Sequence, residues 1–143
     1  MFLFVGLLYS FLTFATDTFT LAPGMIHSCD ADLSDSGGIY KNYSANESIV
    51  QTYCPDQTDP AVSVIQFSRF DTALNAGKLY VFDGPDTQST PIYVSASPDN
   101  SFSGQVVPFQ LRGHTGSGCI TFKFVSNGNP TRPGWEAHLS CAD

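Results

Sequence analysis

The fold is decided by the stretch GCITFKFVSNGNPTRPGWEAHLSC, residues 118–141. Two runs in it place a hydrophobic residue at every second position: Ile120, Phe122 and Phe124 in the first, and Trp135, Ala137 and Leu139 in the second. A period of two is typical of a β-strand with one buried face. The glycines and prolines between the runs interrupt any helix. We therefore expect two antiparallel strands, with Cys119 beside Cys141.

Other short runs extend the same pattern through the chain. Residues rich in β-branched and aromatic side chains occupy 49–53, 61–70, 78–84, 91–97 and 104–113. Pro108 indicates an edge strand or a bulge within the last of these runs. With the closing pair this gives about eight or nine short strands and no helix. The sequence therefore predicts an all-β protein, an antiparallel jelly-roll-like β-sandwich.

Composition restricts the class of partner. The 143 residues are enough for one domain, and only 13% of them are charged. The formal net charge of −7 argues against nucleic acid, because phosphates are bound by lysine and arginine. A surface of uncharged polar residues suits an extracellular module that contacts sugars or other proteins.

The N-terminal residues 1–15 are almost wholly apolar. They are shorter than the roughly 20 residues of a membrane-spanning helix, so we do not expect an integral membrane protein. One interpretation is a secretory signal peptide cleaved after Ala15, although a basic n-region is missing. The other is a retained strand, an assembly arm that needs an apolar groove for its side chains: Phe2, Phe4, Phe11, Phe14, Phe19 and Leu21. A lead-in segment, 16–28, then precedes the domain proper, 29–143.

Four cysteines, an even number behind an apolar leader, predict two disulfides. They are Cys29, Cys54, Cys119 and Cys141. Of the three possible pairings, the sequence favours Cys29–Cys54 and Cys119–Cys141, because each closes a short loop between neighbouring strands. A zinc site is the alternative, but no C-x-x-C pair is present.

These elements together resemble a CUB domain, particularly the form found in bacterial secreted proteins. The resemblance covers residues 29–141 and rests on the order of several motifs: Tyr40 to Glu47, Phe67-x-x-Phe70-Asp71, Leu79 to Gly84, Ser117-Gly118-Cys119, Phe122-x-Phe124-x-Ser126-Asn127-Gly128 and Gly134-Trp135-x-Ala137. It implies a disulfide-stabilised sandwich from an extracellular protein. Such domains mediate protein–protein contacts and sometimes glycan contacts.

Many CUB domains hold a calcium ion on three carboxylates at one end of the sandwich. The corresponding positions here are Ala73, Gly77 and Asn127, so the resemblance implies that the calcium ligands are substituted. Calcium takes about six to eight oxygens, several of them charged. Asp71, Glu47 and backbone carbonyls would have to compensate. We therefore expect neither a metal nor the calcium-dependent binding of a partner's lysine.

No residue pattern indicates catalysis or another cofactor. A nucleophile elbow is missing, and the histidines His27, His114 and His138 are not spaced as metal ligands. Asn42 and Asn46 each begin an N-x-Ser sequon, so we expect a glycoprotein if the source is a eukaryote. Tyr40, Tyr43 and Tyr80 either form a sugar-stacking surface or pack across strands.

The sequence leaves two functional hypotheses. The first is a non-catalytic secreted structural subunit, one lone CUB-like domain that self-assembles into a fibril or coat through its apolar N-terminal arm. An arm strand would pair with a neighbour's sheet, and an open head-to-tail contact of this kind produces filaments. The second is a monomeric adhesion module, with the leader cleaved, that binds a glycan or a protein.

Overall fold

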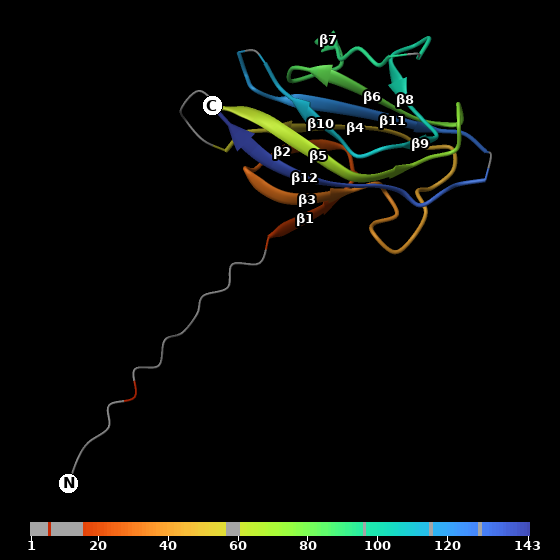
Figure 1. The fold of residues 1–143 in the computed structure, drawn as a ribbon, viewed down its shortest axis with the longest axis horizontal. Coiled ribbons are helices and arrows are strands. Elements are labelled where there is room, and N and C mark those ends of the chain that lie inside the picture. The colour runs from red at the N-terminus through yellow and green to blue at the C-terminus, as the bar shows by residue number, and fades with distance from the viewer. Residues whose placement is uncertain (1–5, 7–15, 57–60, 96, 115, 129) are drawn as a thin grey trace.

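The computed structural model describes residues 6, 16–56, 61–95, 97–114, 116–128 and 130–143. Two sheets pack face to face as a sandwich (Figure 1), and no helix occurs among these residues. Consequently no helix in this part of the chain could cross a bilayer. The all-β sandwich predicted from the sequence is confirmed.

The first sheet has the strand order β1-β3-β12-β5-β10, with β9 also paired to β5. Its strands are β1 (Asp17–Thr20), β3 (Asp30–Ser34), β5 (Val62–Asp71), β9 (Gln105–Val106), β10 (Phe109–Arg112) and β12 (Gly134–Ala142). Pro108 separates β9 from β10, which is an edge strand, as the sequence predicts. An edge strand has no neighbour on one side, so proline, which has no N–H to donate, is tolerated there.

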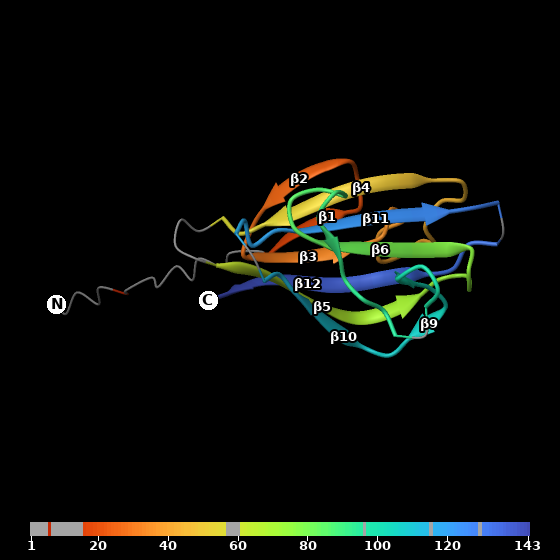
Figure 2. The ribbon, with the colours of Figure 1, turned by 90° about the horizontal axis from the view of Figure 1, so that it is seen from above.

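The second sheet has the order β2-β4-β11-β6-β7, with β8 also paired to β6 (Figure 2). Its strands are β2 (Gly24–His27), β4 (Ser48–Cys54), β6 (Gly77–Asp83), β7 (Thr90–Pro91), β8 (Ser101–Phe102) and β11 (Ile120–Ser126). The described residues form twelve strands, more than the expected eight or nine, because several strands are only two to four residues long.

The prediction that the two strands of residues 118–141 pair with each other is wrong. β11 and β12 lie in opposite sheets, and each pairs with other strands. Their hydrophobic faces nevertheless point inward as predicted: the Trp135 ring lies 4.8 Å from that of Phe124, nearly at right angles. The core is formed by fully buried side chains from both sheets: Ile65, Phe67, Leu79, Val81, Ile120, Phe122, Phe124, Trp135 and Leu139.

Two disulfides are present, as predicted, but the favoured pairing is wrong. The bonds join Cys29 to Cys141 and Cys54 to Cys119. The strand register explains the pairing, since Asp30 lies opposite Ser140 and Tyr53 opposite Ile120, one residue from each bond. Each disulfide therefore joins neighbouring strands of one sheet that are far apart in sequence.

The segment 16–28, expected as a lead-in, contributes a strand to each sheet. β1 pairs in parallel with β3, and β2 pairs in parallel with β4. Leu21 is only 3% exposed, and Phe19 packs against the same core. These two residues of the expected assembly arm thus fill the protein's own interior. The others, Phe2, Phe4, Phe11 and Phe14, lie outside the described residues.

Candidate functional site

Three loops meet at the end of the sandwich opposite the C-terminus (Figure 1). They follow β3, β5 and β11, and hydroxyl groups tie them together. The buried Tyr43 accepts a hydrogen bond at its Oη from the N–H of Ala73 (3.0 Å), and Thr72 Oγ1 donates to the carbonyl of Gly77 (2.6 Å). The first contact holds the loop between β5 and β6 against the loop that follows β3, and the second joins the two ends of the loop between β5 and β6.

The loop after β11 is held in the same way. Ser126 Oγ donates to the carbonyl of Ser44 (2.6 Å) and accepts from the N–H of Glu47 (3.1 Å). The Asn127 N–H donates to the carbonyl of Ala76 (3.1 Å). These three contacts are made by uncharged groups, hydroxyls and backbone amides.

Asp35 lies at the same end of the sandwich and is a carboxylate with no exposed surface. It accepts hydrogen bonds from the N–H groups of Gly37 (2.8 Å) and Trp135 (3.0 Å), and so fixes the turn after β3 to the start of β12. Burial raises the pKa of Asp35 to about 6 from 3.8, despite the two N–H donors, which lower it. A carboxylate at this position organises the fold and is not accessible to a ligand.

This pKa shift predicts a pH-dependent stability. Because the folded-state pKa lies above the unfolded value of 3.8, the stabilising contribution of Asp35 is complete below about pH 3.8 and is lost as the pH rises through 6. The difference between the two limits is at most about 3 kcal/mol. Urea titrations at pH 5 and pH 7 should show slightly less than half of this loss in the wild type, about 1.3 kcal/mol, because the rest is lost between pH 3.8 and pH 5.

The Asp35→Asn variant is the control, since Asn cannot titrate. Its free energy of unfolding should change less between the two pH values than that of the wild type. Comparing the two proteins removes the contribution of Glu47, whose pKa burial also raises. Parallel pH profiles for wild type and variant would contradict the assignment.

Two half-buried carboxylates near these loops, Asp71 and Glu47, already have partners. Asp71 receives two hydrogen bonds from the Arg132 guanidinium, at 2.6 and 3.2 Å. Glu47 Oε1 accepts a hydrogen bond from Ser36 Oγ (2.5 Å). The two acids that would have to compensate for missing calcium ligands are therefore engaged with other side chains.

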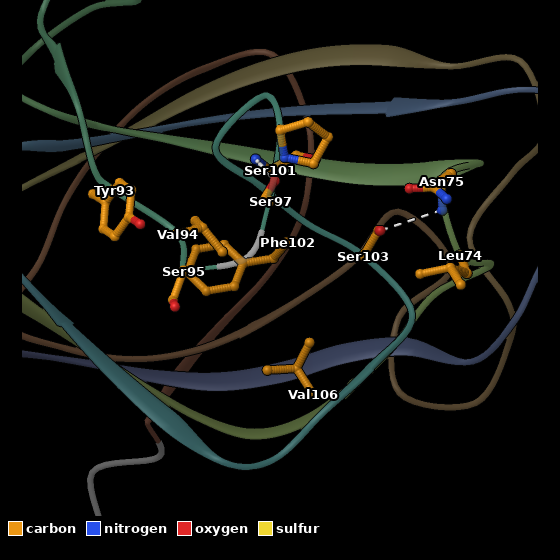
Figure 3. A pocket seen from close by; sticks show the side chains of 11 residues that line it. Leu74, Asn75, Tyr93, Val94, Ser95, Ser97, Ser101, Phe102, Ser103 and Val106 are labelled. Carbon is orange, nitrogen blue, oxygen red and sulfur yellow. Dashed lines mark hydrogen bonds between the residues drawn. The ribbon is translucent and has the colours of Figure 1, made fainter.

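An open pocket of about 410 Å³ lies beside the loop between β5 and β6 (Figure 3). None of its lining side chains is charged: Leu74, Asn75, Tyr93, Val94, Ser95, Ser97, Pro98, Ser101, Phe102, Ser103 and Val106. Leu74 and Tyr93 lie on opposite sides of it and are 71% and 77% exposed. An uncharged pocket with exposed hydrophobic side chains is suited to binding a neutral group.

Comparisons with known proteins identify the architecture. No family model and no curated protein matches the sequence. The structure is similar to the MASP-1 CUB2 domain bound to Ca²⁺, with a TM-score of 0.62 and 15% identity over 83% of this chain and 98% of that one. The chain has a CUB-like fold.

A second solved structure is also similar to this chain. The human MASP-1/3 CUB1-EGF-CUB2 fragment matches with a TM-score of 0.62 and 15% identity, over 89% of this chain and 44% of that one. At this identity the similarity shows the fold alone. The resemblance in the sequence, carried by motifs between residues 29 and 141, therefore identified the fold correctly.

The structure tests whether these residues could hold a calcium ion. The fold brings the positions of Ala73, Gly77 and Asn127 to the same end of the sandwich, since Gly77 pairs with Ser126. A Cβ atom at position 77 would lie 2.6 Å from Tyr43 Oη, so no carboxylate fits there without a shift of that ring. The part of the chain that the structure describes also contains no cluster of three or more His, Cys, Asp or Glu residues able to hold a metal. These residues do not fit a calcium ion.

Calcium should consequently leave the stability unchanged. A ligand raises the melting temperature only if it binds the folded state, and the loops here are held by hydroxyls. After chelation, adding millimolar calcium should shift the Tm by less than about 1 °C. A calcium-specific rise of several degrees, not reproduced by magnesium, would contradict this interpretation.

The remaining predicted residues are separated on the surface. The two sequon asparagines are exposed near the three loops, and Asn42 Nδ2 donates to the carbonyl of Thr131 (2.9 Å). The histidines lie on different elements; His138 lies between Asp30 (3.2 Å) and Asp32 (2.9 Å) on the outer face of β12.

Of the two alternatives for Tyr40, Tyr43 and Tyr80, the sugar-stacking surface does not form as a unit. Tyr43 is buried, Tyr40 is 92% exposed, and Tyr80 donates to Asp99 (3.0 Å). The residues that sequence reasoning missed are Leu74, Asn75 and Tyr93. Tyr93 fell within the strand expected at 91–97, whereas the structure ends β7 at Pro91.

Proposed function

We propose that this chain is a non-catalytic extracellular interaction module that binds its partner, as a folded unit, through the surface around the uncharged pocket. The CUB-like fold supports the proposal, because the resemblance implies extracellular contacts with proteins or glycans. Two disulfides also support secretion, since such bonds persist mainly in oxidising compartments. Secretion is likewise consistent with the apolar residues 1–15, interpreted as a signal peptide.

The observation that carries the proposal is the exposure of large hydrophobic side chains at one pocket. Leu74 and Tyr93 are mostly exposed. Exposed hydrophobic side chains that gather around a concavity, and are not scattered singly, mark interaction sites. No charged side chain lines the pocket, so electrostatic attraction is not its main source of affinity.

The experiment is a binding screen with the secreted, disulfide-bonded protein. We expect saturable, reversible binding to at least one member of an array of extracellular proteins and glycans, with the ligand recovered chemically unchanged. Leu74→Ser should weaken that binding. The matched control is Val50→Ser, which removes a side chain that is 39% exposed on the outer face of β4, away from the pocket.

Three results would overturn the proposal. The first is the chemical conversion of a bound molecule, which would make the protein an enzyme. The second is binding that Val50→Ser and Leu74→Ser weaken equally, which would place the contact elsewhere. The third is failure to bind any member of a broad array.

Self-assembly through the N-terminal arm is the less favoured alternative. Such a donor strand needs apolar side chains that are free to enter a neighbour's sheet. Phe19 and Leu21 already pack in the protein's own core, and β1 pairs with the protein's own β3. A net charge of −7 also causes repulsion between copies. A filament would have to depend on residues 1–15 alone.

A further inference from the structure

We infer that the pocket beside Leu74 binds a neutral sugar unit, which stacks against Tyr93 and is hydrogen-bonded by Asn75 and Ser103. This inference rests on the proposed function and specifies its ligand class. The pocket volume of about 410 Å³ lies towards the small end of the range for ligand sites, roughly 300–1,000 Å³. A terminal sugar of a glycan chain is a ligand of suitable size.

The first argument is the absence of charge in the pocket of a strongly acidic protein. All eleven lining residues are neutral, while the chain carries 13 acidic residues. The nearest acid in sequence, Asp99, is engaged by Lys78 Nζ (2.9 Å) and by the Ser101 hydroxyl (2.6 Å). A charged ligand would lose its hydration shell here and gain no opposite charge. Neutral ligands are therefore favoured over sialylated or sulfated ones.

The second argument is the combination of an apolar floor with unused polar groups. Phe102 and Val106 are partly buried and provide the apolar contact. Within the described residues, the Asn75 side-chain amide and the Ser95 hydroxyl have no hydrogen-bond partner, and Ser103 Oγ accepts only from the Asn75 N–H (3.2 Å; Figure 3). These groups can donate to and accept from sugar hydroxyls.

The third argument is the position of Tyr93. Its side chain is 77% exposed at the side of the pocket opposite Leu74 and Asn75 (Figure 3). The face of an aromatic ring carries partial negative charge and attracts the partly positive C–H groups on the apolar face of a pyranose. A sugar held between these two sides would contact the ring through that face and the amide through its hydroxyls.

The pocket is also held in shape before any ligand arrives. Asp99 accepts hydrogen bonds from the hydroxyls of Ser97 and Ser101 and anchors this loop to Lys78 on β6. The bonds from Ser101 and Lys78 hold the pKa of the Asp99 carboxyl well below its usual range, so it stays ionised. A preorganised loop reduces the entropy lost on binding.

The test is a glycan array that contains matched neutral, sialylated and sulfated members, followed by titration of the best ligand. We expect the wild type to bind neutral glycans preferentially, and Tyr93→Ala to weaken the affinity by about tenfold or more. Tyr93→Phe should retain most of the affinity because it keeps the ring. Asn75→Gly should also weaken binding; glycine is used because Asn75 has a φ of 58°, which glycine tolerates.

The matched control is Tyr40→Ala, which removes a tyrosine that is 92% exposed and does not line the pocket. It should change the affinity by less than about twofold, and all variants should retain the wild-type Tm, since exposed substitutions have small effects on stability. Selective binding of acidic glycans or of a protein, or neutral-glycan binding that survives Tyr93→Ala, would overturn the sugar inference and leave the proposed function standing. Absence of all binding would overturn both.

Discussion

Replacing Gly134 with alanine should lower the free energy of unfolding by about 3–5 kcal/mol. Gly134 opens β12 with a φ of +82°, a conformation that glycine adopts readily and alanine does not. A Cβ atom there would also overlap the Asp35 carboxylate, which is buried and bonded to the N–H of Trp135. The variant must therefore accept backbone strain and displace the group that anchors the strand.

Urea denaturation of Gly134→Ala measures this loss, and Gly128→Ala is the matched control. A Cβ at Gly128 meets nothing closer than 3.6 Å, so that variant should remain within about 0.5 kcal/mol of the wild type. Similar stability for the two variants would show that Asp35 and Gly134 are not packed against each other.

Removing the Cys29–Cys141 disulfide with a double alanine substitution should cost about 3–5 kcal/mol. The bond closes a loop with a sequence separation of 112 residues, so it strongly restricts the unfolded chain. The Cys54–Cys119 pair, with a separation of 65, should give a similar loss. Chemical denaturation of each double variant measures these values.

A third double variant separates the two possible pairings. Cys29→Ala/Cys54→Ala leaves Cys119 and Cys141, which are not partners in the structure. It should contain two free thiols in a thiol-reactivity assay. A variant with no free thiol, destabilised only by the loss of one disulfide, would instead support the pairing of sequence neighbours.

The sequence predicted correctly which face of each strand is buried, because the alternation of apolar and polar residues is a local property. Phe122, Phe124 and Trp135 were expected to be buried, and all three are fully buried. The partner of each strand is not local. β11 and β12 follow each other in sequence but enter different sheets, since each has an apolar face that is covered by the other sheet. Period-two patterns do not distinguish a hairpin from two strands that face each other.

The same limit explains the disulfide error. Proximity in sequence suggested Cys29–Cys54, but Cys29 directly precedes β3 in the first sheet, whereas Cys54 ends β4 in the second. The pairing depends on which distant strand lies alongside, and this is set by the packing of the whole core. Cysteine spacing alone does not contain that information.

The candidate site was predicted only in part. The resemblance grouped positions 73, 77 and 127, and the structure brings them together at one end. The pocket was missed because the alternation at 91–97 was interpreted as a strand. Ser95, Ser97 and Pro98 are typical of loops and were the available signal. The exposure of Tyr93 depends on the turn of this loop, which a local pattern does not specify.

The most direct test of the proposed binding module is sedimentation velocity, with intact-mass analysis, on the protein expressed from residue 1 in secreting cells. We expect one species with the mass of a single chain, shortened by cleavage after Ala15 and containing no free thiols. Such a protein must act through its own folded surface. Full-length chains that sediment as large assemblies, and that return to monomers on Phe11→Ser/Phe14→Ser substitution, would contradict this and establish the N-terminal arm as the functional element.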